Sequence, residues 1–509
     1  MARLIPIVAV AAVLGLSFLA QSRVPFLGVL TAACSTGYGG APTVTSVSPN
    51  TGPSSGGTGV TIGGCGFTGA TAVQFAGTPA TGVVVVSDTQ ITATSPAHAV
   101  GTVDVQVTTP AGTSAIVAAD QFTYALIWYF NWFDRATPGM VGDNIHLLNT
   151  TGATANITVT MPGATPINVS LAAAQETYVT FGAGHIGGPV VVSSDQQILA
   201  SQRVQYYQSF NEVWAMNTAQ AATTLYIPWF DKATNGMYGD NIHVLNPGSV
   251  AAHVVVSLAG ATPSSFTLAA GGENYITFGA GHIGGPVTIT SDVPVLGAQR
   301  IQYYQSFNEE AARPATQAQT TSYFHWFDRA TAGMVGDNIH VFNPGITSAT
   351  VTLTMPGASN IGPFALPAGA ETYVNFGPGH IGGPVTVNST QPVLASQRVQ
   401  YFQSFNEVPQ AAASQAKMVS HIMWFDRATS GMVGDNIHIL NSSGSLANIT
   451  VSLPGASNIG PFALSAGAET YVTFPAGKIG GPVTITADQN VLAAQRVQYF
   501  QSFNEVAAG

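Results

Sequence analysis

Charged side chains are rare in this chain of 509 residues, and most of them occupy equivalent positions in four successive segments. Each segment keeps four acids and two bases, which in the first segment are Asp134, Asp143, Glu176, Glu212, Arg135 and Arg203. These positions hold 24 of the 36 charged residues of the chain. Charged residues that only face solvent would be expected to occupy different positions in different segments. We therefore expect these side chains to have fixed partners or to line a site.

The first chemistry that this pattern suggests is a buried ion-pair network. Arg203 lies in an alternating stretch that puts Arg203, Gln205 and Tyr207 on one face of a strand. A buried charge is costly unless it is paired, so we expect Arg203 to contact a carboxylate of its own segment. The predicted structural ion-pair network comprises, over the four segments, Asp134, Asp143, Arg203, Glu212, Asp231, Asp240, Arg300, Glu309, Asp328, Asp337, Arg398, Glu407, Asp426, Asp435, Arg496 and Glu505.

The alternative is a ligand site built from the same groups and the repeated sequence Gly-Asp-Asn-Ile-His. Its candidate binding residues are Asn144, His146, Asn241, His243, Asn338, His340, Asn436 and His438. A zinc site would need further His or Cys, and His185 is replaced by Lys478 in the fourth segment, so no metal site is predicted. Calcium bound by Asp143, Asn144 and backbone carbonyls remains an open alternative.

Catalytic chemistry finds little support in the sequence. A nucleophile with its base, or a pair of carboxylates, would have to occur four times in small domains that have no insertion to shape a pocket. The glycine-rich run 182–188 lies between expected strands rather than at a helix N-terminus, so it cannot cradle a phosphate. The 13 basic residues are scattered singly, which excludes nucleic acid as a partner. No catalytic residue and no cofactor are predicted.

The elements that carry these residues form an internal repeat of about 97 residues. Trp132-Phe-Asp recurs at Trp229, Trp326 and Trp424. The first copy contains seven short runs with strand-like alternation, separated by Pro-Gly and Gly-Gly-Pro turns, and none with helical spacing. This pattern predicts an all-β protein of tandem β-sandwich domains. The predicted repeats are residues 125–213, 222–310, 320–408 and 418–506, arranged as a string of self-sufficient domains.

The region before the repeats has a different character. Ser48-Pro-Asn-Thr-Gly-Pro-Ser-Ser-Gly-Gly-Thr58 is followed by the turn Gly64-Cys-Gly-Phe67 and by short alternating runs as far as Tyr124. Residues 41–124 resemble the IPT/TIG family, and the resemblance implies an immunoglobulin-like sandwich of the kind found in bacterial surface proteins. The repeats, through the stretch from Ala200 to Glu212, resemble a β domain of secreted bacterial proteins, which implies no particular activity.

The N-terminal segment predicts export. Residues 1–33 combine Arg3 with two apolar runs, as in a signal peptide or a membrane anchor. Cys34 follows, at a position that would suit lipidation; with Cys65 it could instead form at most one disulfide. We expect contact with the membrane only through this segment or through a lipid on Cys34.

Together these features predict a non-enzymatic, exported bacterial protein at the cell surface or outside the cell. Its expected role is structural or adhesive, with tandem β domains that project from the envelope. A multivalent carbohydrate-binding protein is the alternative, in which four weak sites gain avidity because they are tethered. A glycan or protein on a cell surface is the expected partner, and the sequence does not identify it.

Overall fold

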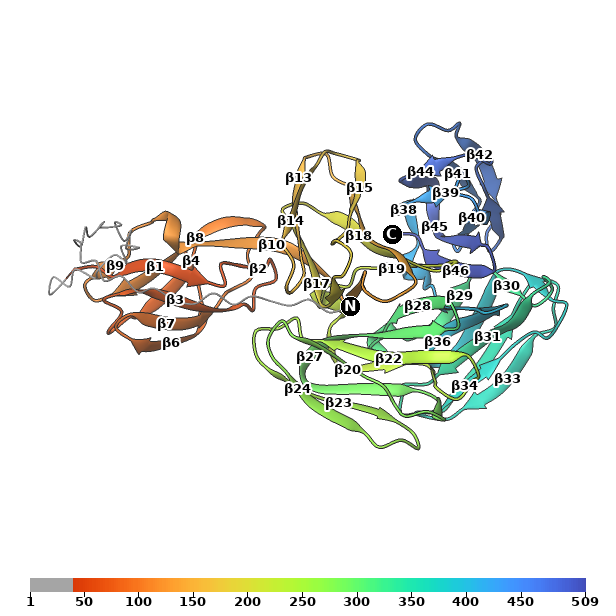
Figure 1. The fold of residues 1–509 in the computed structure, drawn as a ribbon, viewed down its shortest axis with the longest axis horizontal. Helices are drawn as coiled ribbons and strands as arrows, with labels where there is room; N and C mark the ends of the chain where they lie inside the picture. The colour runs from red at the N-terminus through yellow and green to blue at the C-terminus, as the bar shows by residue number, and fades with distance from the viewer. Residues whose placement is uncertain (1–39) are drawn as a thin grey trace, which may run out of the picture.

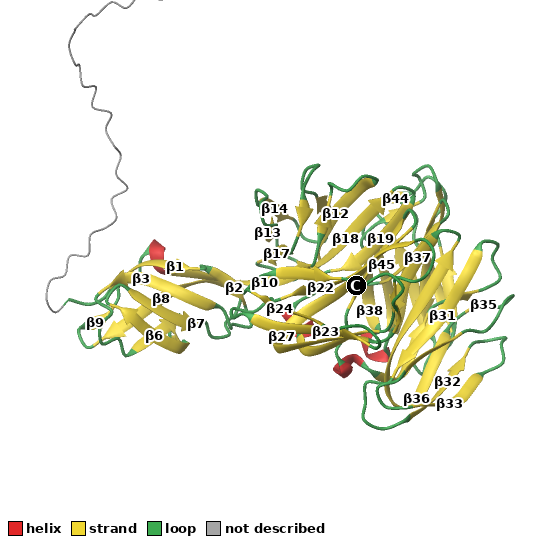
Figure 2. Cartoon of the chain, turned by 60° about the horizontal axis from the view of Figure 1, so that its bottom comes forward, coloured by secondary structure: helices red, strands yellow, loops and turns green. Residues whose placement is uncertain are grey.

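The computed structural model of the chain describes residues 40–509, which form an all-β protein (Figures 1 and 2). The predicted signal or anchor segment, residues 1–33, and the candidate lipidation site Cys34 lie outside the described residues. No helix within residues 40–509 has the length and apolar character needed to cross a membrane. The helical elements of this part are short 3-10 turns, η1 (Ala118–Asp120), η2 (Thr218–Gln220), η3 (Ala315–Gln317) and η4 (Ala413–Gln415).

The N-terminal domain is a two-sheet sandwich, as the sequence predicts. One sheet has the order β1-β3-β7-β6, and the other contains β5, β4, β8 and β10. Phe67, Phe75, Phe122 and Tyr124 fill the space between the sheets, and Cys65 takes part in a disulfide. Its strands are β1 (Thr43–Ser48), β2 (Thr51–Pro53), β3 (Gly59–Cys65), β4 (Ala72–Phe75), β5 (Thr78–Pro79), β6 (Thr81–Ser87), β7 (Gln90–Thr94), β8 (Gly101–Thr109), β9 (Gly112–Thr113) and the first part of β10 (Gln121–Phe130).

Repeat 1 is a second sandwich, and its two sheets have the orders β14-β13-β17-β10 and β15-β12-β18-β19. Alternating residues such as Ile145, Leu147 and Val192 point inward and form the core. The end of the glycine-rich run, Ile186–Gly187, pairs with the Phe133–Asp134 strand as a small ribbon, β11-β16. Its strands are β11 (Phe133–Asp134), β12 (Met140–Asn149), β13 (Ala155–Thr160), β14 (Ile167–Leu171), β15 (Glu176–Val179), β16 (Ile186–Gly187), β17 (Val190–Ser194), β18 (Ile198–Tyr206) and β19 (Ser209–Trp214).

Repeats 2 to 4 keep this architecture, but a single long strand crosses both sheets where repeat 1 has β17 and β18. Repeat 2 comprises β20 (Ala222–Ile227), β21 (Phe230–Asp231), β22 (Met237–Leu245), β23 (Ala252–Leu258), β24 (Ser264–Leu268), β25 (Glu273–Ile276), β26 (Ile283–Gly284), β27 (Val287–Tyr303) and β28 (Ser306–Ala311). Repeat 3 comprises β29 (Gln319–Phe324), β30 (Phe327–Asp328), β31 (Met334–Phe342), β32 (Ala349–Thr354), β33 (Ile361–Leu366), β34 (Glu371–Val374), β35 (Ile381–Gly382), β36 (Val385–Tyr401) and β37 (Ser404–Pro409). Repeat 4 comprises β38 (Lys417–Ile422), β39 (Phe425–Asp426), β40 (Met432–Leu440), β41 (Ala447–Ser452), β42 (Ile459–Leu464), β43 (Glu469–Val472), β44 (Ile479–Gly480), β45 (Val483–Tyr499) and β46 (Ser502–Ala507).

The N-terminal domain and repeat 1 share a strand. The first part of β10 pairs with β8 of the N-terminal domain, and Leu126 to Phe130 pair with β17 of repeat 1. At its other end, each repeat folds back on its own first strand. In repeat 1 the backbone N–H groups of Tyr129 and Met216 each donate to the other residue's carbonyl oxygen. The structural unit therefore extends a few residues beyond the predicted boundary at 213.

The four repeats close into a ring. Figure 1 shows them around a common centre, with the N-terminal domain attached to one side. Near this centre, β19, β28, β37 and β46 are linked by hydrogen bonds, for example from the backbone N–H of Glu309 to Asn211 Oδ1 at 3.2 Å. Trp214 Nε1 of repeat 1 donates to the carbonyl oxygen of Ala507 in repeat 4, which closes the circle. Successive repeats thus use the same head-to-tail contact.

The expectation of an extended string of domains is therefore wrong. Five separate domains in a row would span on the order of 200 Å. In the ring each repeat contacts two neighbours instead, and apolar side chains of successive repeats pack together there, as Ile301 and Tyr303 of repeat 2 do with Phe405 of repeat 3.

Small-angle X-ray scattering of the full chain distinguishes the two shapes. A rod on the order of 200 Å long has a radius of gyration of about 60 Å, whereas a compact chain of this length has about 24 Å. We expect a value near 30 Å, because the N-terminal domain extends beyond the ring. A value above about 50 Å would show that the ring is open in solution.

Candidate functional site

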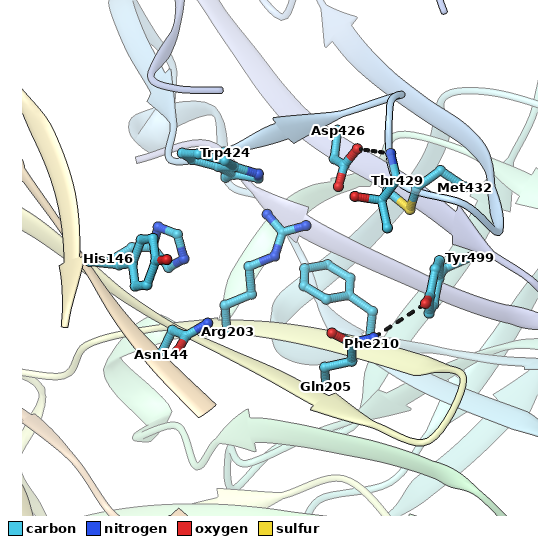
Figure 3. Close-up of a pocket in the computed structure, with 11 residues that line it drawn as sticks. Asn144, His146, Arg203, Gln205, Phe210, Trp424, Asp426, Thr429, Met432 and Tyr499 are labelled. Carbon is cyan, nitrogen blue, oxygen red and sulfur yellow. Dashed lines mark hydrogen bonds between the residues drawn. The ribbon is translucent and has the colours of Figure 1, made fainter. Parts of the chain in front are cut away.

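A pocket lies at each of the four interfaces between repeats. The four cavities have volumes of about 200 to 230 Å³ and equivalent linings. One repeat contributes a tryptophan, an aspartate, a threonine, a methionine and a tyrosine, and the next contributes an asparagine, a histidine, an arginine and further aromatic side chains. We call these cavities the inter-repeat pockets. Figure 3 shows the one between repeats 4 and 1.

The strand alternation of one sheet positions one half of each pocket. In repeat 1, Asn144 pairs directly with Arg203 across β12 and β18, and His146 pairs with Tyr178 across β12 and β15. The intervening residues, such as Ile145, face the core. The sheet therefore presents Asn144, His146, Tyr178 and Arg203 together on its outer face, toward repeat 4.

A buried carboxylate positions the other half. Asp143 is fully buried and points to the opposite face from Asn144. Its Oδ2 accepts a hydrogen bond of 2.8 Å from the backbone N–H of Asp134, and its Oδ1 accepts one of 2.7 Å from Gln202 Nε2. Gln202 Nε2 also donates to the carbonyl oxygen of Trp132. These bonds fix the Trp132-Phe-Asp134 turn, which projects Trp132 and Asp134 into the pocket shared with repeat 2.

Packing under this turn leaves room only for glycine. Gly188 lies directly beneath the turn, where a Cβ atom would overlap the carbonyl oxygen of Asn131. The repeated Gly-Gly-Pro sequence thus has a positional role in each copy. In the turn itself, Asp134 Oδ1 accepts hydrogen bonds from the backbone N–H groups of Ala136 and Thr137, and Oδ2 accepts one from Thr137 Oγ1.

Aromatic rings join the two halves of each pocket. At the interface between repeats 1 and 2, the ring of Trp132 lies 5.3 Å from that of His243 and 5.6 Å from that of Tyr275. His243 Nδ1 is 2.7 Å from Glu273 Oε1. Burial raises the pKa of Glu273 to about 8 and lowers that of His243 well below its usual value. Both shifts favour the uncharged forms of this pair, and the imidazole of His243 lines the pocket.

The arginines lie beside a carboxylate of their own repeat. Arg203 Nη1 is 3.9 Å from Glu212 Oε2, and Arg300 Nε is 3.3 Å from Glu309 Oε2. Arg398 and Arg496 lie at 3.8 and 3.9 Å from Glu407 and Glu505. Each guanidinium also stacks on a phenylalanine, such as Phe210 at 4.0 Å from Arg203. Of the predicted network, Glu212 and its equivalents are thus the partners found within the same copy.

The two aspartates of the predicted network have other positions. Asp134 lines the pocket that contains Arg300 of the next repeat, and Asp426 of repeat 4 lines the one that contains Arg203. The same relation holds for Asp231 with Arg398 and for Asp328 with Arg496. Asp143, Asp240, Asp337 and Asp435 are buried beneath the Trp-Phe-Asp turns instead, and each bonds to a glutamine.

The candidate binding residues Asn144, Asn241, Asn338, Asn436, His146, His243, His340 and His438 all line inter-repeat pockets. The calcium alternative required Asp143 and Asn144 to act together, and the structure turns them to opposite faces. Residues 40–509 contain no group of three or more His, Cys, Asp or Glu placed to hold a metal ion.

Several pocket residues were not identified from the sequence. They include Tyr178, Gln205, Phe210, Thr137 and Met140 with their equivalents. Gln205 Nε2 donates across the interface to the hydroxyl of Tyr499 at 3.2 Å, and the equivalent bond from Gln302 to Tyr206 is 2.8 Å long. The signal available in the sequence was the recurrence of Tyr178 as Tyr275, Tyr373 and Tyr471. The structure shows that the side chain of Tyr178 is about half exposed.

A larger cavity of about 550 Å³ lies at the centre of the ring. Glutamates from all four repeats line it, among them Glu212 and Glu505. Repeat 2 adds Glu310, whose pKa is raised well above its usual value by burial and by Glu407. Arg313 lies 3.5 Å from Glu310 and donates to the carbonyl oxygen of Ala395 in repeat 3. This Glu-Arg pair has no counterpart in the other repeats, so the centre is less symmetric than the pockets.

Removing one arginine tests the buried pair. Arg203→Ala leaves the carboxylate of Glu212, whose side chain is 2% exposed, without its cation. We expect a loss of about 3 to 5 kcal/mol in unfolding free energy, measured by urea denaturation of the full chain. Arg135→Ala is the matched control, because Arg135 forms no salt bridge within residues 40–509. Equal effects of the two substitutions would contradict the pairing.

The buried acids predict how stability depends on pH. Burial raises the pKa of Asp143, Asp240, Asp337 and Asp435 to about 7, far above the value of about 3.9 in an unfolded chain. The folded chain thus binds these protons more tightly, and the stability they contribute is lost as the pH rises through 7. We expect the Tm to fall as the pH rises from 6.5 to about 8, where the last of these protons are released. Below pH 6.5 the lowered pKa of His243, His340 and His438 acts in the opposite direction.

Calorimetry at several pH values measures this slope, and replacing all four aspartates by asparagine should reduce it. A Tm that does not fall over this range in the unmodified chain would show that these carboxyls are already ionised in the fold.

Comparison with known proteins identifies the N-terminal domain. Residues 42–124 match the IPT/TIG domain model, and no curated protein matches the chain in sequence. Similar solved structures include gamma-CGTase from alkalophilic Bacillus clarkii, at 18% identity over 35% of this chain and 25% of that one, with a TM-score of 0.17. A tetra-tandem repeat in the extending region of a large adhesion protein is 11% identical over 73% of this chain and 99% of that one, with a TM-score of 0.12. TM-scores this low carry no argument about function. Residues 42–124 are an IPT/TIG domain, followed by four repeated β domains.

Proposed function

We propose that the chain is an exported, non-enzymatic adhesion protein whose ring of repeats is a multivalent binding head. In this proposal the N-terminal segment directs the chain out of the cytoplasm, and the IPT/TIG domain connects the ring to the cell envelope. The ring presents four equivalent pockets to a glycan-bearing surface. This combines the adhesive role with the carbohydrate-binding alternative that the sequence left open.

The observation that carries this proposal is the repetition of one pocket at all four interfaces, including the one that joins the last repeat to the first. A ring with a purely structural role would need interfaces that are packed and closed. Here the tyrosine at each pocket, for example Tyr178 at 52% exposure, keeps a large aromatic surface in solvent. Large exposed aromatic groups beside polar side chains are typical of recognition surfaces.

The pocket chemistry supports binding rather than catalysis. Hydrolysis of a glycosidic bond normally uses two carboxyl groups on opposite sides of the bond. Each inter-repeat pocket is lined by one, Asp134 or its equivalent, and hydrogen bonds from its own turn already engage both oxygens of Asp134. Two further acids lie behind the lining, and both are engaged: Glu273 is paired with His243, and Glu309 lies beside Arg300.

Four weak sites in one rigid body give avidity without high affinity at any single site. Once one pocket is occupied, a neighbouring pocket meets further ligand on the same surface at an effective concentration of order mM. The closed ring fixes the spacing of the pockets, so binding strength should depend on ligand density.

Agglutination tests the multivalency. We expect the full chain to cross-link particles coated with a polysaccharide that it recognises, at a density threshold, whereas excess soluble monosaccharide should disperse the aggregates. Proteolysis of intact cells, followed by detection of the ring, tests export. A chain protected inside intact cells, or one that retains no particle from a broad polysaccharide panel, would contradict the adhesive role.

A further inference from the structure

We propose that each inter-repeat pocket binds one uncharged pyranose ring, held jointly by two neighbouring repeats. This inference rests on the proposed binding function and specifies its ligand. It concerns four composite sites, so the isolated repeat is not the binding unit.

The aromatic groups at each pocket provide a stacking surface. Trp132 of repeat 1 is half-buried, and Tyr275 of repeat 2 is 47% exposed beside it, with the two rings nearly perpendicular at 79°. The C–H groups on one face of a pyranose carry partial positive charge, and the face of an aromatic ring is negative. A sugar ring can therefore lie against these aromatic groups while its hydroxyl groups point to the polar side of the pocket.

The charges in the pocket exclude a strongly charged ligand. Arg300 and Asp134 line the same cavity from opposite repeats. The guanidinium disfavours a cation such as a quaternary ammonium group, which an aromatic pocket would otherwise suit. The carboxylate disfavours an anion, and Glu309 at 3.3 Å already balances Arg300. An uncharged ligand with several hydroxyl groups meets both charges without an electrostatic penalty.

Unused hydrogen-bonding groups match such hydroxyls. Asn241 lines the pocket, and its side-chain amide makes no hydrogen bond to any residue of the range 40–509. It offers both donors and an acceptor, which is what a pair of neighbouring hydroxyl groups requires. Asp134 accepts three hydrogen bonds, and a carboxylate has about four acceptor positions. The imidazole of His243 lines the same pocket.

The volume limits the ligand to one ring. The four cavities measure about 200 to 230 Å³, below the range of about 300 to 1,000 Å³ of pockets that enclose drug-sized molecules. Each pocket therefore accommodates a single sugar residue, such as the terminal residue of a chain that continues into solvent.

Titration of the full chain with methyl pyranosides tests this inference. The probes are methyl glucoside, galactoside, mannoside and N-acetylglucosaminide, with methyl glucuronide and glucosamine as charged comparisons. We expect at least one uncharged glycoside to bind four molecules per chain with a Kd of about 1 mM, as measured by calorimetry and by tryptophan fluorescence. No binding by any uncharged glycoside, or binding of the charged sugars only, would overturn the inference.

Substitution of the pocket asparagines locates the sites. Asn144→Ala should lower the stoichiometry from four to three, because it alters only the pocket between repeats 4 and 1. The quadruple variant at Asn144, Asn241, Asn338 and Asn436 should bind at least tenfold more weakly with little change in Tm. Ile346→Ala is the control, since Ile346 is 96% exposed and lies outside the pockets.

The two proposals can fail separately. If the quadruple variant still binds the glycoside as the unmodified chain does, the pockets are not the sites. If that variant also agglutinates particles normally, adhesion stands and the inference about the pockets is wrong. If the pyranosides bind the pockets but no polysaccharide-coated particle is agglutinated, the sites exist and the multivalent adhesive function is wrong.

Discussion

The buried carboxylate of Asp143 and its equivalents is the interaction on which the ring depends. A carboxyl group with no access to water must be hydrogen-bonded. Asp143 meets this need with the backbone N–H of Asp134 and the side chain of Gln202, which also holds the carbonyl of Trp132. The Trp-Phe-Asp turn is thereby fixed. Trp132 can then contact the next repeat, and the same contact made four times closes the chain on itself.

The sequence was sufficient to predict the fold of each unit. Alternation, turn residues and the repeat length predicted tandem sandwiches, and the Ser48 to Phe67 motif predicted the IPT/TIG domain, which is confirmed. Asn144, His146 and Arg203 were predicted as candidates for one site, and strand alternation puts Asn144 and His146 on one face. The structure adds that Asn144 pairs with Arg203, which places the arginine beside them.

The ring could not be predicted, for a reason specific to repeated sequences. Every copy contains both Trp132 or its equivalent and His146 or its equivalent. A contact between Trp132 and His146 within a copy would leave the same sequence pattern as the contact between Trp132 and His243 that the structure shows. Asp134 illustrates the same ambiguity, because it lies opposite the arginine of the next repeat rather than its own. Only the three-dimensional arrangement separates contacts within a copy from those between copies.

The strand that the IPT/TIG domain shares with repeat 1 has a mechanical consequence. β10 pairs with β8 through its first half and with β17 through its second half, so one sheet continues from the domain into the ring. Tension applied along this strand loads the inter-strand hydrogen bonds in shear, and they resist together rather than opening one after another. No flexible linker separates the domain from repeat 1, because β10 is continuous from Gln121 to Phe130. Traction on the N-terminal side would therefore pass directly into the ring, whose head-to-tail closure distributes it over the other repeats.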